Sequence, residues 1–201
     1  LYGEFNARNV LAVIATMLSM GYLPSEIQAA IGRIGTVPGR MDVIRRSNLP
    51  TVVIDYAHTP DALEKCLLAT RKHFGNRNLV CVFGCGGDRD KLKRPVMGQI
   101  AARLATSVVL TDDNPRSEDS ATIIAEVKSG VSSKNVQIIS DRRAAIMFAI
   151  GDASPDSVVV IAGKGHEDYQ DVKGQRLPFS DYTVVMEALG SVVQGEVSIG
   201  E

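Results

Sequence analysis

Short apolar runs alternate with helix-forming segments over most of the sequence. The runs lie at residues 51–55, 79–84, 107–111, 136–140 and 157–163. They are continuously apolar rather than alternately apolar and polar, which is typical of strands that are buried on both faces of a sheet. Strands that alternate with helices predict a parallel sheet with right-handed crossovers. We therefore expect an α/β fold, with a mostly parallel sheet flanked by helices.

Helical spacing and end signals place the helices between these runs. Thr59 with Pro60 is expected to begin the first of them, and another helix follows Asp141. Further helices are predicted over 95–105, over 121–129 with Ser120 as its cap, and over 181–189, and a hairpin is predicted near Lys173 and Gly174.

The first 45 residues follow a different pattern. Apolar positions recur at helical spacing after Asn6, which is expected to cap a helix, and again between Pro24 and Gly35. Two helices without a sheet to cover cannot build a core of their own. We therefore interpret residues 1–45 as the tail of a preceding domain, 45–50 as a linker, 50–190 as one complete domain and 191–201 as a flexible tail.

Charged and glycine-rich segments follow four of the predicted strands. They read DYAHTPD (55–61), GCGGDRDK (84–91), TDDNPR (111–116) and AGKGHED (162–168). In an open parallel sheet, ligands bind beyond the carboxyl ends of the strands. We therefore expect these four segments to share one rim and to form a ligand site, with the glycines allowing the backbone to approach the ligand closely.

The side chains of these segments combine both signs of charge. Arg89 and Arg116 carry planar guanidinium groups suited to a carboxylate or phosphate, whereas Asp113 and Glu167 suit an ammonium group. A ligand with both carboxylates and amines explains the mixture, and an amino acid is the simplest such ligand. The alternatives are a surface ion pair of Arg89 with a neighbouring aspartate and a solvated turn at Glu167.

Two other residues of the expected rim, Asp55 and His58, each allow more than one interpretation. Asp55 ends a strand and either begins a turn or accepts hydrogen bonds from a sugar hydroxyl. His58 precedes a helix N-terminus, where the helix dipole favours an anion, although a single histidine is more often structural than catalytic.

The amino-acid composition favours a soluble globular protein and gives no sign of a nucleic-acid or membrane partner. The apolar content of 45% and charged content of 22% are ordinary for a soluble globular protein, and the formal net charge of -1 suggests neither nucleic acid nor an anionic membrane as a partner. The three cysteines are expected to be reduced thiols of a cytoplasmic protein, and no ligand set for a metal is recognised. The Gly-Lys spacing of a phosphate-binding P-loop is absent from the sequence.

Six motifs, read together, resemble the Mur ligase family. They are GEFNARN, PGRMD, VVIDYAHTPDALEK, VFGCGGDRDKLKRP, TDDNPRSED and AGKGHEDYQ, and with the last helix they span Gly3 to about Leu189. The resemblance implies a Rossmann-like domain, preceded by a helical remnant of a central ATPase domain. It also implies that a first domain for a UDP-sugar and the P-loop lie outside this sequence. The run DNPR resembles the signature of members that add meso-diaminopimelate rather than lysine.

The resemblance implies an ATP-dependent amide ligase of peptidoglycan synthesis. In that reaction ATP phosphorylates a carboxyl of UDP-N-acetylmuramoyl-L-alanyl-D-glutamate, and the amine of meso-diaminopimelate attacks the acyl phosphate. The residues implied to bind meso-diaminopimelate are Arg89, Asp113, Asn114, Pro115, Arg116, Gly163 and Glu167, with Arg116 on its distal carboxylate and Glu167 on an ammonium group. Those implied near ATP are Asn6, Asn9, Arg40, Asp55 and His58.

No residue of this sequence is assigned as a catalytic acid or base, and the ligands of Mg²⁺ are expected mainly outside it. The expected partners are small molecules, and the protein is expected to be a monomer. Two alternatives stay open: a ligase that adds lysine or another amino acid, and a non-catalytic binding module. Calorimetric titration of the chain with ATP and with meso-diaminopimelate discriminates the last of these, and weak binding of either is expected.

Overall fold

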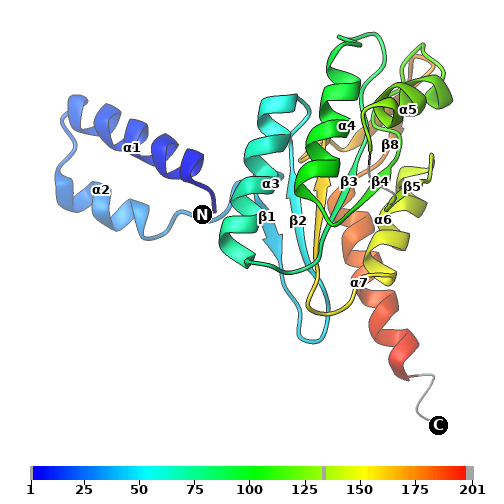
Figure 1. Ribbon diagram of the computed structural model, residues 1–201. Coiled ribbons are helices and arrows are strands. Elements are labelled where there is room, and N and C mark those ends of the chain that lie inside the picture. The colour runs from blue at the N-terminus through cyan, green and yellow to red at the C-terminus, as the bar shows by residue number, and fades with distance from the viewer. Residues whose placement is uncertain (1, 133–134, 198–201) are drawn as a thin grey trace.

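The computed structural model describes residues 2–132 and 135–197 and consists of an α/β sandwich beside a pair of helices (Figure 1). In chain order the elements are α1 (Glu4–Ser19), α2 (Pro24–Ile31), β1 (Asp42–Ile44), β2 (Thr51–Asp55), α3 (Pro60–Phe74), β3 (Leu79–Phe83), α4 (Lys93–Leu104), β4 (Ser107–Leu110), α5 (Ser120–Ser129), β5 (Val136–Ile138), α6 (Arg142–Gly151), β6 (Val158–Ala162), β7 (Tyr169–Val172), β8 (Gln175–Pro178) and α7 (Asp181–Val197). None of the helices in these ranges is long and apolar enough to cross a membrane.

The main sheet has the order β1-β2-β6-β3-β4-β5, and all of its pairs are parallel except β1 with β2. This confirms the predicted α/β class. The strand β1 was not predicted, because three half-buried residues are too short to give a pattern. It places residues 42–44 in the sheet, ahead of the segment interpreted as a linker.

The register of the central strands aligns their carboxyl ends. Ala162 at the end of β6 pairs with Asp55 of β2 and with Phe83 of β3, and Phe83 pairs with Leu110 of β4. The segments that follow these four strands therefore leave the sheet at the same level. Their shared rim, expected from the sequence, follows directly from this alignment.

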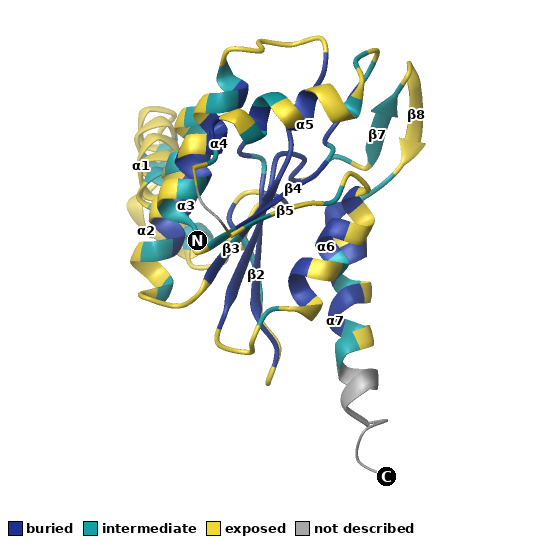
Figure 2. Ribbon diagram, turned by 45° about the vertical axis from the view of Figure 1, so that its right-hand side comes forward, coloured by how far each residue is buried: buried dark blue, intermediate teal, exposed yellow. Residues whose placement is uncertain are grey.

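Helices cover both faces of the sheet, as Figure 2 shows. Along β6, Val158 and Val160 belong to the apolar cluster under α3, α4 and α5, whereas Val159 and Ile161 belong to the cluster under α6 and α7. A strand that contacts helices on both faces must be apolar at every position, which is the pattern in the sequence.

One predicted helix cap agrees with the structure and two differ. Thr59 caps α3, as predicted, and Asp141, after which a helix was expected, caps α6. The prediction for α5 was wrong, because the carboxylate of Asp119 accepts from the backbone N–H of Thr122 at 2.9 Å and Ser120 is the first helical residue. The prediction that Asn6 caps α1 was also wrong, since the helix already begins at Glu4 and the Asn6 amide donates to the Tyr2 carbonyl oxygen.

The helices α1 and α2 lie to one side of the sheet in Figure 1. α1 has no buried residue and α2 has only Ile27, so neither helix has a core of its own. At the other end, α7 continues to Val197, past the predicted end at Leu189. The predicted flexible tail, 191–201, is therefore helical as far as Val197, and its last four residues lie outside the described ranges.

Candidate amino-acid site

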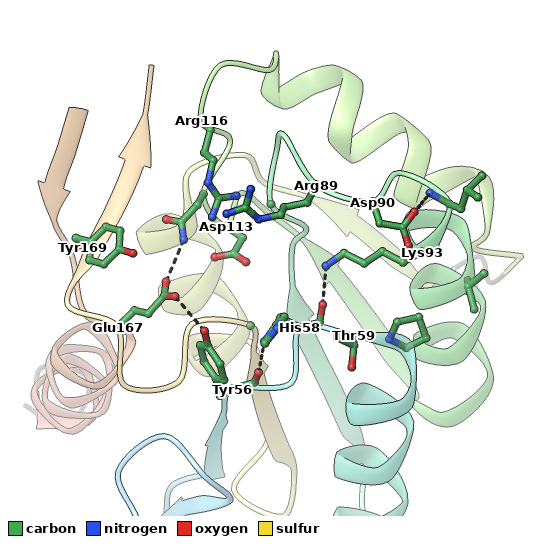
Figure 3. Close-up of a pocket in the computed structure, with 16 residues that line it drawn as sticks. Tyr56, His58, Thr59, Arg89, Asp90, Lys93, Asp113, Arg116, Glu167 and Tyr169 are labelled. Atoms are coloured by element: carbon green, nitrogen blue, oxygen red, sulfur yellow. Dashed lines mark hydrogen bonds between the residues drawn. The ribbon is translucent and has the colours of Figure 1, made fainter. Parts of the chain in front are cut away.

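The four rim segments enclose a cavity of about 770 Å³ beyond the carboxyl ends of the strands (Figure 3). Its wall contains six of the seven residues that the sequence implied for diaminopimelate, namely Arg89, Asp113, Asn114, Arg116, Gly163 and Glu167. Pro115, in the loop after β4, is buried and does not line the cavity. His58, which the sequence implied near the nucleotide, lines the same cavity together with Tyr56.

The glycine-rich segment after β3 packs directly on the segment after β4. The backbone N–H of Gly87 donates to the Asn114 carbonyl oxygen at 2.9 Å, and a Cβ at Gly87 would collide with the carbonyl oxygen of Pro115. A Cβ at Gly84 would likewise collide with the carbonyl oxygen of Thr111. These two glycines therefore allow two loops to approach each other, rather than allowing the backbone to approach a ligand.

Replacing Gly87 by alanine is expected to lower the free energy of unfolding by about 1–3 kcal/mol, because the added methyl group displaces the 111–116 loop. The matched control is Gly151→Ala at the end of α6, where a Cβ meets no atom within 4 Å. That change is expected to be neutral or to stabilise by up to about 1 kcal/mol. Urea unfolding of both variants tests the contact, and equal stability of the two would contradict it.

Arg116 is held in place through its backbone and its side chain. Its φ of 51° is unusual for a residue other than glycine. Hydrogen bonds to β7 maintain this conformation, since Arg116 N–H donates to the Asp171 carbonyl oxygen and Lys173 N–H donates to the Arg116 carbonyl oxygen. The guanidinium donates through Nη1 to the Gly87 carbonyl oxygen at 2.7 Å. The side chain is thereby directed into the cavity, as Figure 3 shows.

Arg89 is exposed and lies beside Arg116 at the cavity (Figure 3). Its Nη1 donates to the backbone oxygen of Asp88 at 2.9 Å, and within the described ranges it has no ion pair with the side chain of Asp88 or Asp90. The surface ion pair considered from the sequence is therefore not formed. The two guanidinium groups make this side of the cavity positive.

The acidic side chains of the cavity contact a lysine that the sequence analysis missed. Lys164 is fully buried, and its Nζ lies 2.8 Å from Asn114 Oδ1, 3.1 Å from Glu167 Oε2 and 3.5 Å from Asp113 Oδ1. The segment AGKGHED lacks the spacing of a phosphate-binding P-loop, and its lysine was given no role. The signal that could have identified Lys164 is its position between two glycines, directly after a buried strand and next to the expected ligand site.

Glu167 is not part of a solvated turn. It accepts from Asn114 Nδ2 at 3.0 Å as well as from Lys164, and its other oxygen lies 3.5 Å from the Tyr56 hydroxyl. Partial burial opposes ionisation of Glu167, but the hydrogen bonds from Asn114 and Lys164 outweigh it and hold its pKa below the ordinary value. The carboxylate is therefore charged at neutral pH.

Asp113 is the less fully bonded of the two carboxylates. It is 7% exposed and lines the cavity, and its Oδ1 is buried 3.5 Å from Lys164 Nζ, without a hydrogen-bond partner among the described residues. A buried oxygen of this kind is costly unless an opposite charge is near, and Lys164 supplies that charge. The cavity thus brings guanidinium groups and carboxylates together.

A buried ion pair holds the backbone at the ends of two strands that lead into the site. Arg142 and Asp181 are fully buried and are joined by two hydrogen bonds of 2.8 Å. The same guanidinium donates to the carbonyl oxygens of Asp112 and Ala162, at the ends of β4 and β6. Asp112, to which the sequence assigned no role, accepts from Ser120 Oγ and so ties the loop to α5.

Three of the five residues implied near ATP, Arg40, Asp55 and His58, lie close together around Tyr56, whereas Asn6 and Asn9 on α1 lie apart from them. Asp55 is buried and accepts from the Met41 backbone N–H at 2.8 Å; this burial raises its pKa. The Arg40 guanidinium lies 4.7 Å from the centre of the Tyr56 ring. Asn6 bonds to Tyr2 within α1, and Asn9 lines a separate groove of about 740 Å³ between α1 and α3. Only His58 lies in the amino-acid cavity, so the nucleotide assignments stay predictions.

Metal ligands do not cluster in the described part of the chain. No group of three or more His, Cys, Asp or Glu side chains there converges as a metal site requires. The three cysteines are free thiols and buried, and burial raises the pKa of Cys81 to about 12 and that of Cys85 to about 11.

Comparison with known proteins agrees with the motifs. Residues 39–165 match the family model "Mur ligase, glutamate ligase domain". The UDP-N-acetylmuramoyl-L-alanyl-D-glutamate–2,6-diaminopimelate ligases of Chromobacterium violaceum and Ectopseudomonas mendocina are each 50% identical, over 94% and 95% of this chain. A solved structure of an enzyme with that name has a TM-score of 0.74 and 43% identity, and it matches 95% of this chain and 39% of its own.

The chain spans 38% and 39% of the length of the two curated relatives. The family model covers β1 to β6, the helices α3 to α6 and the first three rim segments, and it ends at Gly165 within the fourth. The chain therefore belongs to the Mur ligase family, of which it contains the glutamate ligase domain.

Proposed function

We propose that this chain is the amino-acid-binding part of an ATP-dependent ligase that joins meso-diaminopimelate to UDP-N-acetylmuramoyl-L-alanyl-D-glutamate in peptidoglycan synthesis. The names of the relatives, which are 50% identical to it, support this assignment. The observation that carries it is the meeting of Arg116 with Asp113 and Glu167 in one cavity. Opposite charges in one cavity complement a ligand that is itself a zwitterion.

The arrangement of charges favours diaminopimelate over lysine. Both amino acids offer an amine for the reaction, but only diaminopimelate has a carboxylate beside the ammonium group at its far end. We propose that Arg116, assisted by Arg89, binds that carboxylate, and that Asp113 and Glu167 bind the ammonium group. Lysine would leave the guanidinium of Arg116 without its anion, which is unfavourable in a partly desolvated site.

In the proposed reaction, ATP transfers its terminal phosphoryl group to the side-chain carboxylate of the D-glutamate, giving an acyl phosphate and ADP. The amine of diaminopimelate then attacks the acyl carbon and loses a proton, the bond to phosphate breaks, and an amide forms. The residues of this chain bind one end of diaminopimelate and so hold the amine at the other end in a fixed place. Fixing the nucleophile in this way lowers the entropic part of the barrier.

The proposal leaves phosphoryl transfer to parts of the protein beyond this sequence. Mg²⁺ would neutralise the phosphate charge during that step, and the described residues do not supply a set of ligands for it. The prediction that Asn6, Asn9, Arg40, Asp55 and His58 lie near the nucleotide is kept as part of the proposal. Reduced, buried cysteines support a cytoplasmic protein.

A substrate panel on the product of the complete reading frame tests the proposed function. With ATP and UDP-N-acetylmuramoyl-L-alanyl-D-glutamate, kcat/KM is expected to be higher for meso-diaminopimelate than for L-lysine by roughly 10- to 150-fold, the equivalent of about 1.5–3 kcal/mol for the lost ionic contact. Release of phosphate is the measured quantity. A preference for L-lysine, or no ligation with either amino acid, would refute the proposal.

A further inference from the structure

A fully buried lysine lies behind the wall of the cavity, in contact with its two carboxylates. Lys164 follows Gly163 after β6, and its ammonium group contacts Asn114, Glu167 and Asp113 from beneath. The ring of Tyr169 lies 5.6 Å from Nζ and covers the group further. The lysine is 0% exposed and is not part of the cavity wall, so a ligand does not reach it.

Lys164 sets the orientation of the Asn114 amide. Asn114 Oδ1 accepts from Lys164 Nζ at 2.8 Å and from the Asp171 backbone N–H at 2.9 Å. With its oxygen directed to these two donors, the amide must present Nδ2 to Glu167, which accepts it at 3.0 Å. One cation therefore places both the amide and the carboxylate that it binds.

The net charge of Asp113, Glu167 and Lys164 is neutralised by one ammonium group of a ligand. Two carboxylates (Asp113 and Glu167) and one ammonium group (Lys164) leave a net charge of one negative unit. Lys164 is hydrogen-bonded to Glu167 but lies 3.5 Å from Asp113, whose Oδ1 has no hydrogen-bond partner in the described ranges. Glu167 is thus largely satisfied within the protein, whereas the side chain of Asp113, which lines the cavity, accepts no hydrogen bond from the described residues.

We infer that Lys164 is a positioning residue for amino-acid binding: it fixes Asn114 and Glu167 and offsets one of the two carboxylate charges, so that the site accepts a single ammonium group. This inference rests on the proposed function. Without the buried cation, the uncompensated like charges favour uptake of a proton by Glu167, which then no longer accepts a hydrogen bond from the ligand's ammonium group.

The variant Lys164→Met removes the charge and retains most of the side-chain volume. In the complete protein, its KM for meso-diaminopimelate near pH 6 is expected to rise by about tenfold or more, while the KM for ATP stays within about twofold. Lys128→Met, on α5 and away from the cavity, is the matched control and is expected to leave both values unchanged. Lys164→Arg retains the positive charge and is expected to restore part of the affinity.

The pH profile separates this role from a merely structural one. In the wild type, Glu167 has a lowered pKa and stays ionised from about pH 6 to about pH 8, so its ionisation does not change the KM for meso-diaminopimelate over that range. In Lys164→Met, the proton taken up by Glu167 leaves as the pH rises, and the KM falls towards the wild-type value. The charged or titratable groups that face the cluster from the elements around it, present in both proteins, include Arg116, Arg142, Tyr56, His58, Tyr169 and Cys85.

The inference is overturned if Lys164→Met binds meso-diaminopimelate as the wild type does, or if its KM is raised equally at every pH. Should that variant not fold, Lys164→Gln, which keeps a donor for Asn114 but has no charge, is expected to give the same dependence on pH, and a flat profile overturns the inference equally. The wild type is assayed first. Failure of the wild type to ligate meso-diaminopimelate refutes the proposed function, whereas ligation by the wild type with unchanged variants refutes only the role of Lys164.

Discussion

Replacing Arg116 by alanine in the complete protein is expected to raise the KM for meso-diaminopimelate by roughly 10- to 150-fold, which corresponds to about 1.5–3 kcal/mol for a charge-assisted contact. The guanidinium is partly buried, directed into the cavity and held by Gly87, so it needs no reorganisation before it binds a carboxylate. The KM for ATP is expected to change little. Steady-state kinetics with each substrate varied in turn measures both effects.

Two further variants sharpen this test. Arg103→Ala removes an exposed arginine that is paired with Glu64 between α3 and α4, and it is expected to leave both KM values within about twofold. Arg116→Lys keeps the charge but loses the planar fork, and an intermediate KM for meso-diaminopimelate is expected. An equal loss of affinity for ATP and meso-diaminopimelate in Arg116→Ala would contradict the role given to Arg116.

Replacing Arg142 by methionine is expected to reduce the free energy of unfolding by about 3–5 kcal/mol, because it leaves Asp181 buried without its partner. The loss extends to the site, since the same guanidinium donates to the carbonyl oxygens of Asp112 and Ala162 at the strand ends. Urea unfolding of the chain measures the change.

The double variant Arg142→Met with Asp181→Leu separates the charge from the packing. With both ions replaced by apolar groups, a large part of the lost stability is expected to return, because no uncompensated charge remains. The two carbonyl oxygens stay without a donor, so full recovery is not expected. A single variant that costs less than about 1 kcal/mol would show that the pair is not important for stability.

The sequence predicted the sheet and the rim because both follow from local patterns. Continuous apolar runs indicate strands covered on both faces, and Asp113, Arg116 and Glu167 each follow such a run directly. Parallel strands bring these positions to one edge whatever the details of packing. That is why Arg116, Asp113 and Glu167, far apart in the sequence, line one cavity as expected.

The remaining features depend on tertiary contacts that a local pattern does not contain. The role of Lys164 depends on Asn114 and Glu167 meeting above it, and the role of Gly87 depends on the backbone of a neighbouring loop. The cap of α5 was misplaced by one residue because Asp119 and Ser120 are both good caps, and only the backbone conformation distinguishes them.

The site for meso-diaminopimelate is tested most directly by the structure of the complete protein crystallised with that amino acid. The distal carboxylate is expected within hydrogen-bonding distance of the Arg116 guanidinium, with the adjacent ammonium group on Asp113 and Glu167. The amine at the other end should point out of the cavity, away from Glu167. Diaminopimelate bound elsewhere, or bound with its distal carboxylate away from Arg116, would contradict the proposed site.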